Sequence, residues 1–219
     1  MIPQHIFVTG TDTEVGKTRI SVALIKKLQQ QGYRTAGMKP IASGCEWHEQ
    51  QWQNEDALAL IAQSDVFLPY AVVNPYAFEP AIAPHIAAEQ GNVQIDLTVI
   101  DAHYQMIKRH SDAVVVEGAG GWLVPINQQQ TMADIAKQLA LPVVLVVDIK
   151  LGCINHALLT VASIEQHGLA LAGWVANHRQ EQTESRQMID TLRARIKAPC
   201  LGVVPYLSRA DMCADSFLN

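Results

Sequence analysis

The chain has 219 residues, of which 49% are hydrophobic and 17% charged, and it carries a formal net charge of −5. This balance supplies enough apolar side chains for one sizeable core and excludes disordered, collagen-like and coiled-coil chains. The sequence has no dense Lys/Arg block and no apolar run that approaches the ~18 residues of a membrane span. We therefore expect neither nucleic acid nor a membrane as a partner.

The first residues lead directly into an apolar run and lack the basic, apolar and cleavage-site regions of a secretory signal peptide. This favours a cytoplasmic protein. The four cysteines are far apart and show no CxxC spacing, so neither a zinc site nor a disulfide framework is indicated and free thiols are expected. They are Cys45, Cys153, Cys200 and Cys213.

Short apolar, β-branched runs predict strands, and the amphipathic stretches between them predict helices. The runs are continuously apolar rather than alternating, which is typical of strands buried on both faces of a parallel sheet. The pattern predicts one α/β domain over residues 1–219 with a doubly wound, mostly parallel sheet. In chain order the expected strands are residues 6–9, 35–39, 113–116, 143–147, 173–176 and 201–204. The expected helices are residues 17–31, 55–63, 97–110, 132–139, 154–167 and 184–196.

The second and third expected strands are separated by a long segment, residues 40–91, that contains several prolines. It is too long for a simple crossover connection. We expect a functional insertion here rather than a second domain.

A glycine-bracketed loop, GTDTEVGKT from Gly10 to Thr18, follows the first expected strand and precedes the first expected helix. Backbone N–H groups of such a loop, the positive end of the next helix, the Lys17 ammonium and the Thr18 hydroxyl together suit a nucleoside triphosphate with Mg²⁺. A turn that merely caps a helix would not need Lys17 and Thr18 together. Five residues instead of the usual four separate Gly10 from Gly16, which indicates a specialised branch of phosphate-loop proteins.

Polar residues follow the carboxyl ends of other expected strands, which is where ligands gather in open α/β sheets. Lys39 and nearby Ser43 follow the second strand, and the lysine could stabilise a transferring phosphoryl group or a carboxylated substrate, or simply be a surface residue. Glu117 ends the third strand and precedes glycines, a pattern similar to a Walker B element with Glu in place of Asp. A carboxylate there is a natural Mg²⁺ partner for Thr18.

Two further residues have weaker signals. Asp56 stands near the start of an expected helix, where an acidic side chain ordinarily caps the helix or offsets its dipole. Asn177 ends the fifth strand, where its amide could read a base edge.

Five motifs in this order resemble the dethiobiotin synthetase family, and the resemblance covers nearly the whole chain. The five-residue spacing of the phosphate loop is that family's own form. The motifs are residues 10–18, 35–40, 116–122, 152–156 and 173–177.

The resemblance implies a fold of the P-loop nucleoside triphosphate hydrolase type and a homodimer with its substrate site near the interface. It also implies Mg·ATP-dependent ring closure of 7,8-diaminononanoate with CO₂ or bicarbonate, giving dethiobiotin, ADP and phosphate. The intermediates would be an N-carbamate and a carbamic-phosphoric anhydride.

By position, the resemblance assigns catalysis to Lys39 and Lys17. It assigns Mg²⁺ to Thr18, Asp56 and Glu117, which changes the interpretation of Asp56 from a capping residue to a metal ligand. The substrate-binding positions are Thr13, Ser43 and Asn155. The ATP-binding positions are Glu14, Val15, Gly16, Lys17, Thr18, Arg19, Asp56, Glu117, Gly118, Ala119, Gly120, Asn177, Pro205, Tyr206 and Leu207.

Other interpretations remain open. A partner-switching P-loop ATPase of the partitioning or metallochaperone type would need a second lysine early in the loop, where this chain has Asp12 and Glu14. A simple metabolite kinase would not need the Lys39 turn beside the phosphate loop. A diverged paralogue would act on a related diamine.

Overall fold

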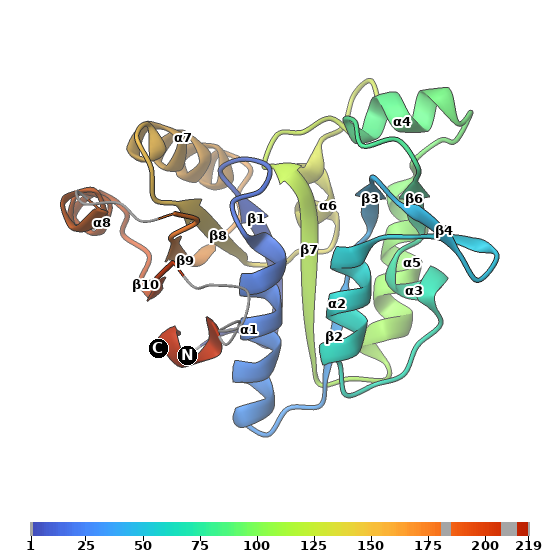
Figure 1. The fold of residues 1–219 in the computed structure, drawn as a ribbon, viewed down its shortest axis with the longest axis horizontal. Helices are drawn as coiled ribbons and strands as arrows, with labels where there is room; N and C mark the ends of the chain where they lie inside the picture. The colour runs from blue at the N-terminus through green and yellow to red at the C-terminus, as the bar shows by residue number, and fades with distance from the viewer. Residues whose placement is uncertain (1, 181–184, 207–213, 219) are drawn as a thin grey trace.

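The computed structural model describes residues 2–180, 185–206 and 214–218. Within them a six-stranded, wholly parallel sheet in the order β10-β9-β8-β1-β7-β2 lies between layers of helices (Figure 1). Its strands are β1 (His5–Gly10), β2 (Thr35–Met38), β7 (Ala113–Gly121), β8 (Val143–Asp148), β9 (Leu171–Asn177) and β10 (Cys200–Val204). The helices are α1 (Lys17–Gln30), α2 (Glu55–Gln63), α3 (Tyr70–Val73), α4 (Pro84–Gln90), α5 (Leu97–Lys108), α6 (Met132–Gln138), α7 (Cys153–Gln166), α8 (Ser185–Arg195) and the 3₁₀-helix η1 (Ala214–Phe217). The shorter strands are β3 (Ile41–Ser43), β4 (Glu46–His48), β5 (Gln51–Gln53) and β6 (Tyr76–Phe78).

The predicted α/β fold with a doubly wound parallel sheet is confirmed. Every predicted strand and helix is present, with ends that differ by a few residues. The largest difference is in β7, which the sequence predicts to end at residue 116 and which continues to Gly121. The strand continues because Gly10 of β1 pairs with Gly121, so the glycine-rich tail of β7 stays beside the first strand.

Alternate side chains of the strands point to opposite faces of the sheet. Ile6 and Val8 pack in a core cluster that includes residues of α1 and α2. Phe7, between them, packs in a cluster that includes residues of α5 and α6. The same second face is covered at β8 and β9 by α7 and α8, around the fully buried Trp174. Because both faces are covered, the strands can be continuously apolar.

Residues 40–91 contain elements that the sequence analysis does not predict. β3 and β6 form a small parallel sheet, and β4 and β5 form a hairpin in which Trp47 and Trp52 pack edge to face. Only α2 is predicted in this segment. Strands of three residues are too short to give a periodic signal.

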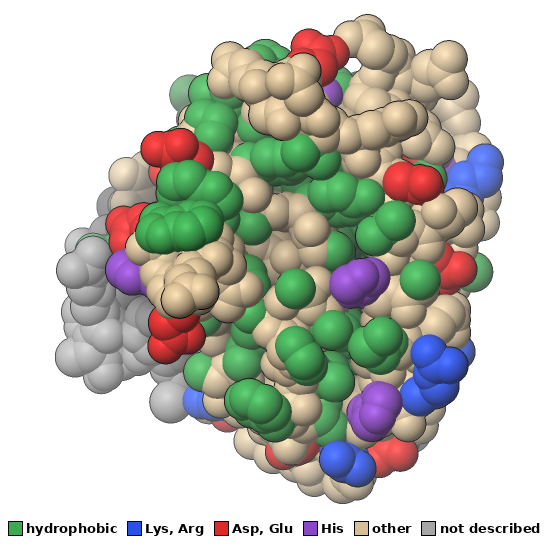
Figure 2. Space-filling view, turned by 90° about the vertical axis from the view of Figure 1, so that its right-hand side faces the viewer, with side chains coloured by type: hydrophobic (Ala, Val, Ile, Leu, Met, Phe, Trp, Pro, Cys, Tyr) green, Lys and Arg blue, Asp and Glu red, His purple; other side chains and the backbone are tan. Residues whose placement is uncertain are grey.

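Figure 2 shows the right-hand side of Figure 1, where α3, α4, α5 and the β4–β5 hairpin lie. Apolar side chains gather in the middle of this face, with charged side chains toward its edges (Figure 2). Exposed members on these elements are Trp47, Ile86, Val99 and Met106. Exposed apolar side chains of this kind are ordinary on protein surfaces.

The cysteine prediction is confirmed for Cys45, Cys153 and Cys200, which are free thiols. Cys213 lies outside the described residues. In the ranges that the structure describes, no helix is long and apolar enough to cross a bilayer.

Gly37 in β2 allows α2 to pack closely against the sheet. A Cβ added at Gly37 would lie 2.7 Å from Cβ of Leu60 and 3.2 Å from Cδ1 of Ile25. This close packing matters for the site, because Asp56 is the second residue of α2 and β2 ends one residue before Lys39.

We expect Gly37→Ala to lower the free energy of unfolding by about 1–3 kcal/mol, because backbone and helix must move apart. Urea denaturation measures this. Gly121→Ala in β7 is the control, since the nearest atom to a Cβ there is 3.7 Å away. Equal stability of the Gly37 variant and the wild type would contradict the packing argument.

Candidate active site

The phosphate loop lies between β1 and α1, at the carboxyl edge of the sheet. Two of its residues have left-handed backbone, Glu14 with φ 57° and Gly16 with φ 91°. The first helical bond runs from Ile20 N to Gly16 O over 3.1 Å. The N–H groups of α1 before Ile20 therefore point out of the helix end, toward the position of an anion.

Lys17 folds back over this loop. It is buried, and its Nζ donates to the carbonyl oxygen of Asp12 at 3.0 Å. Burial, and next the ammonium of Lys39, lower the pKa of Lys17 to about 8, although nearby carboxylates oppose the shift. An anion bound in the loop would stabilise the charged form of this lysine.

Lys39 and Glu117 form a buried ion pair beside the loop. Met38 of β2 pairs with Val116 of β7, so the residues that follow them, Lys39 and Glu117, lie side by side. Lys39 Nζ lies 2.6 Å from Glu117 Oε1, and the two residues are 3% and 0% exposed. The register of two parallel strands thus places both side chains at one point.

Asp56 completes this charged cluster. Its Oδ2 lies 3.0 Å from Lys39 Nζ, which also donates to the carbonyl of Gly118 at 3.2 Å. Burial disfavours the charged form of Lys39, but the carboxylates of Glu117 and Asp56 outweigh burial and hold its pKa above the ordinary value. For Asp56, burial is likewise outweighed, by Lys39 and then the Thr18 hydroxyl, so its pKa is lowered. Lys39 and Asp56 are therefore charged at neutral pH.

Three oxygen-bearing side chains here suit a hard cation. The Thr18 hydroxyl donates to Glu117 Oε1 at 2.9 Å, and Asp56 is close to both Thr18 and Lys39. The other oxygen of Glu117, Oε2, is buried and has no hydrogen-bond partner among the described residues. Mg²⁺ commonly takes one or two carboxylates and completes its shell with phosphate and water. Thr18, Asp56 and Glu117 fit that pattern.

Asn177 contacts the phosphate loop directly. It ends β9, is fully buried, and donates from Nδ2 to the carbonyl of Val15 at 2.8 Å. Its Oδ1 is buried with no partner among the described residues and remains available to a ligand. The sequence suggests only a contact with a base, so the bond to the loop is an additional finding. Of the residues expected after β10, Tyr206 is half exposed and Leu207 lies outside the described residues.

The expected substrate residues divide between two sides of the loop. Ser43 ends β3, and its hydroxyl oxygen is buried without a partner among the described residues. Thr13 belongs to the loop, with Oγ1 3.6 Å from a Cβ built on Gly120. Asn155 is exposed near the start of α7, which follows β8 on the other side of β1 (Figure 1). The structure therefore brings Ser43 and Thr13 toward the cluster and leaves Asn155 apart from it within one chain.

Asn54 is a site residue that sequence reasoning missed. Its Oδ1 accepts the N–H groups of Asp56 and Ala57, and its Nδ2 donates to the carbonyl of Ser43 at 3.4 Å. An Asn directly before two acidic residues is a common helix N-cap signal, and it would have identified this residue.

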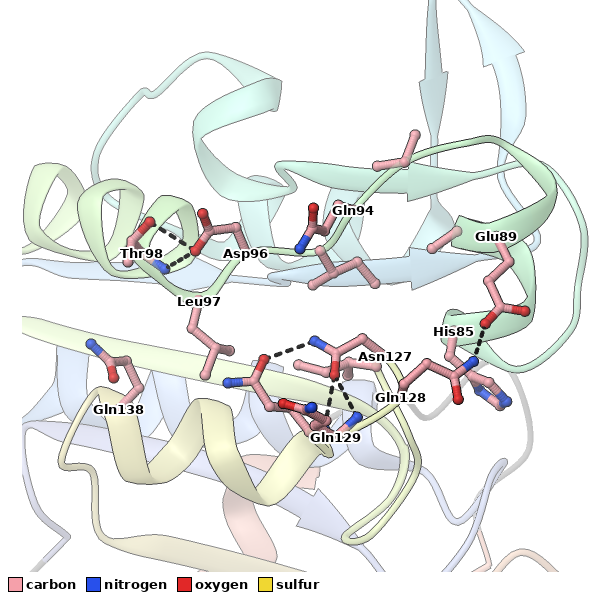
Figure 3. Close-up of a pocket in the computed structure, with 15 residues that line it drawn as sticks. His85, Glu89, Gln94, Asp96, Leu97, Thr98, Asn127, Gln128, Gln129 and Gln138 are labelled. Carbon is pink, nitrogen blue, oxygen red and sulfur yellow. Dashed lines mark hydrogen bonds between the residues drawn. The ribbon is translucent and has the colours of Figure 1, made fainter.

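A separate cavity of about 700 Å³ lies between α4, the start of α5 and residues 126–130 (Figure 3). Glu89 and Gln128 are hydrogen-bonded across it. None of its lining residues belongs to the phosphate loop or the Lys39 cluster. It is therefore distinct from the candidate active site.

Comparison with known proteins gives the class first. A family model described as an AAA domain matches residues 4–212. The MinC:MinD cell division complex of Aquifex aeolicus is similar in fold, with a TM-score of 0.60 and 14% identity over 98% of this chain and 86% of that chain. The signal recognition particle receptor FtsY of Elizabethkingia anophelis gives a TM-score of 0.56 and 13% identity over 99% and 62%. Together, this fold, the phosphate loop and Lys17 place the chain in the class of P-loop nucleoside triphosphatase folds.

Curated relatives then give the family. Proteins named ATP-dependent dethiobiotin synthetase BioD match at 47% identity in Marinobacter nauticus, over 96% of this chain and 92% of the relative. The match is 49% in Pseudomonas paraeruginosa, over 95% and 92%, and 48% in Cellvibrio japonicus, over 99% and 95%. The chain belongs to the dethiobiotin synthetase family.

Gly16 is the loop residue with the strictest requirement. A Cβ there would clash with Nδ2 of Asn177, and φ is 91°. We expect Gly16→Ala to weaken ATP binding at least about tenfold, because the loop must move away from Asn177. Isothermal calorimetry with a non-hydrolysable ATP analogue measures this.

Gly152→Ala is the matched control. Gly152 precedes α7, has the same φ of 91°, and has no atom within 4 Å of a built Cβ. Both variants carry the same backbone strain, so an equal effect of the two on affinity would show that strain, and not the contact with Asn177, is responsible.

Proposed function

We propose that the chain converts 7,8-diaminononanoate and CO₂, or bicarbonate, to dethiobiotin, with conversion of ATP to ADP and phosphate. The observation that carries the proposal is the buried Lys39–Glu117 pair beside the phosphate loop, with the partly exposed Asp56 against Lys39. Its Lys39 ammonium, held between two carboxylates, supports the proposal as a positive charge for a carboxylated amine and a transferring phosphoryl group. The names of the relatives support this choice of reaction.

ATP would bind along the loop and the carboxyl ends of β7 and β9. The N–H groups at the start of α1 and the Lys17 ammonium would hold the phosphates. Asn177 Oδ1, which has no partner among the described residues, would accept from the amino group of the base. The remaining contacts are assigned to Glu14, Val15, Gly16, Thr18, Arg19, Asp56, Glu117, Gly118, Ala119, Gly120, Pro205, Tyr206 and Leu207.

Mg²⁺ would be held by Thr18, Asp56 and Glu117. The buried, unpartnered Oε2 of Glu117 supports this set, because a buried carboxylate oxygen needs a partner. When bound, the ion would neutralise charge on the phosphate oxygens of ATP.

The reaction would proceed in three steps. One amine of the substrate adds to CO₂ and loses a proton, giving a carbamate. The carbamate oxygen attacks the γ-phosphorus and ADP leaves. The second amine then attacks the carbamoyl carbon and loses a proton, phosphate leaves, and the ring closes.

Lys39 would stabilise the negative charge of these steps, since its side chain stays protonated and buried. Lys17 would share the charge of the transferring phosphoryl group. The free hydroxyl of Ser43, and Thr13 on the loop, would orient the diamine. In this way residues 40–91 would act as the functional insertion that the sequence predicts, by supplying Ser43 and Asp56.

A homodimer would complete the substrate site. Asn155 is exposed and lies on the far side of the loop from Lys39, so in one chain it is apart from the cluster. Leu151 and Leu159, near it on the α7 side, are 96% and 63% exposed. Pairing of two chains across this surface would bury both leucines and bring Asn155 to the interface. The cytoplasmic location stays a prediction.

The reaction itself is the first test. Incubation of the protein with Mg·ATP, bicarbonate and 7,8-diaminononanoate is expected to give dethiobiotin by mass spectrometry and one ADP per product. Phosphate release that does not require bicarbonate would favour a metabolite kinase. Hydrolysis that requires neither bicarbonate nor diamine would favour a partner-switching ATPase, and product from a different diamine alone would indicate a diverged paralogue.

Lys39→Ala tests the role of the cluster. We expect kcat to fall by about 100-fold or more while the affinity for ATP changes little, because Lys39 acts mainly on charge that develops during the reaction. Steady-state kinetics and nucleotide titration measure the two effects. Lys27→Ala is the control, since Lys27 lies outside the phosphate loop and the Lys39 cluster and its Nζ donates to the carbonyl of Leu218 at 3.0 Å. Collapse of ATP binding in Lys39→Ala would instead identify Lys39 as a phosphate anchor.

A further inference from the structure

A chain of polar side chains connects the backbone of Lys39 to the start of α2. Its members are Asn74, Tyr70 and Asn54, all from residues 40–91. None of them belongs to the phosphate loop or to the charged cluster. Asn74 is 3% exposed and Asn54 9%, so their polar groups depend on protein partners rather than on water.

In this series of side chains, each group donates a hydrogen bond to the next. The N–H of Asn54 donates to Tyr70 Oη at 2.8 Å, and Oη donates to Asn74 Oδ1 at 2.7 Å. Asn74 Nδ2 donates to the carbonyl of Lys39 at 2.6 Å and to that of Tyr76 at 3.3 Å. Two carbonyls facing Nδ2 and one hydroxyl facing Oδ1 fix the orientation of this amide. Hydrogen bonds linked in this way strengthen one another.

The backbone of Lys39 is held on both sides by the end of α3. Its N–H donates to the carbonyl of Val73 at 3.0 Å, and its carbonyl accepts from Asn74. Lys39 follows the last residue of β2, where pairing with β7 ends. The one-turn helix α3 therefore satisfies the backbone groups that the sheet no longer satisfies.

At the other end of this series of hydrogen bonds, Asn54 positions Asp56. Asn54 Oδ1 caps α2 by accepting from the N–H of Asp56 at 3.1 Å, and Asn54 Nδ2 donates to the carbonyl of Ser43. Because Asp56 in turn contacts Lys39 Nζ, the interactions close into a ring. The ring runs from the Lys39 backbone through Asn74, Tyr70 and Asn54 to Asp56 and returns to the Lys39 side chain.

We infer that Tyr70, with Asn54 and Asn74, is a positioning unit that holds Lys39 and Asp56 in their reactive arrangement. This inference rests on the proposed function. Tyr70 occupies the middle of the ring, and its hydroxyl joins Asn74, which binds the Lys39 backbone, to Asn54, which caps the helix of Asp56. Burial raises the pKa of Tyr70 to about 12, although the N–H of Asn54 opposes the shift, so the hydroxyl keeps its proton.

Tyr70→Phe tests the inference, since it removes only the hydroxyl group and keeps the aromatic side chain. We expect kcat for dethiobiotin formation to fall about tenfold or more, with the KM values for ATP and diamine within about twofold of wild type, because small misplacements of reacting groups reduce rate strongly. The matched control is Tyr76→Phe. The Tyr76 hydroxyl also accepts one backbone N–H, from Asp96 at 3.0 Å, but outside the ring, and its loss should leave kcat unchanged.

A double-mutant cycle separates positioning from general stability. In an Asp56→Asn background, Tyr70→Phe should lower kcat much less than it does in the wild type. The reason is that both changes weaken the same contact, between Lys39 and Asp56. A loss of equal size in both backgrounds, or equal losses for Tyr70→Phe and Tyr76→Phe, would overturn the inference.

Hydrogen exchange gives a readout that does not depend on activity. Tyr70→Phe should accelerate exchange at the amides of Lys39, Asn54 and Asp56, while Tyr76→Phe should not. If the wild type forms no dethiobiotin, the proposed function fails, and exchange still decides the inference. Unchanged exchange at these amides would overturn it, and acceleration at both ends of the ring would support it.

Discussion

The buried ion pair between Lys39 and Glu117 is the interaction on which the arrangement of the site depends. Removing both charges from water costs several kcal/mol for each ion, and their attraction offsets this only when other groups satisfy the remaining donors and acceptors. Asp56, the Gly118 carbonyl and the Thr18 hydroxyl do so here. Apolar side chains of similar volume would stabilise such a position at least as well, so reactivity is the better explanation of the pair.

Much of the scaffold around this pair could be predicted from sequence. Continuous apolar runs indicate strands covered on both faces, and the glycine loop with Lys17 and Thr18 identifies the edge where ligands bind. Lys39 and Glu117 follow the predicted ends of two strands, although β7 in fact continues past Glu117 to Gly121. Their contact could not be predicted, because sequence periodicity does not give strand order, and it is the adjacency of β2 and β7 that brings them together.

The residues that support the pair were harder to predict. From its position alone, Asp56 is better explained by helix capping or dipole compensation, and only the resemblance to a family changed that interpretation. Asn54, Tyr70 and Asn74 form hydrogen bonds between segments of residues 40–91 that have no helical or strand periodicity in common. The bond from Asn177 to Val15 spans 162 positions along the chain. Single polar contacts of this kind leave no pattern in a sequence.

The position of Asn155, across the first strand from Lys39, has a consequence for how such a protein can change during evolution. Lys39, Glu117 and Asp56, the groups suited to phosphoryl transfer, are held on one side of β1 by ion pairs and hydrogen bonds. In the part of the chain that the structure describes, no hydrogen bond or ion pair joins the exposed start of α7 to these groups. With the proposed role of Asn155 in substrate binding, substitutions there would alter which molecule is recognised while the chemistry is preserved, so the two properties could diverge independently in descendants of one ancestral chain.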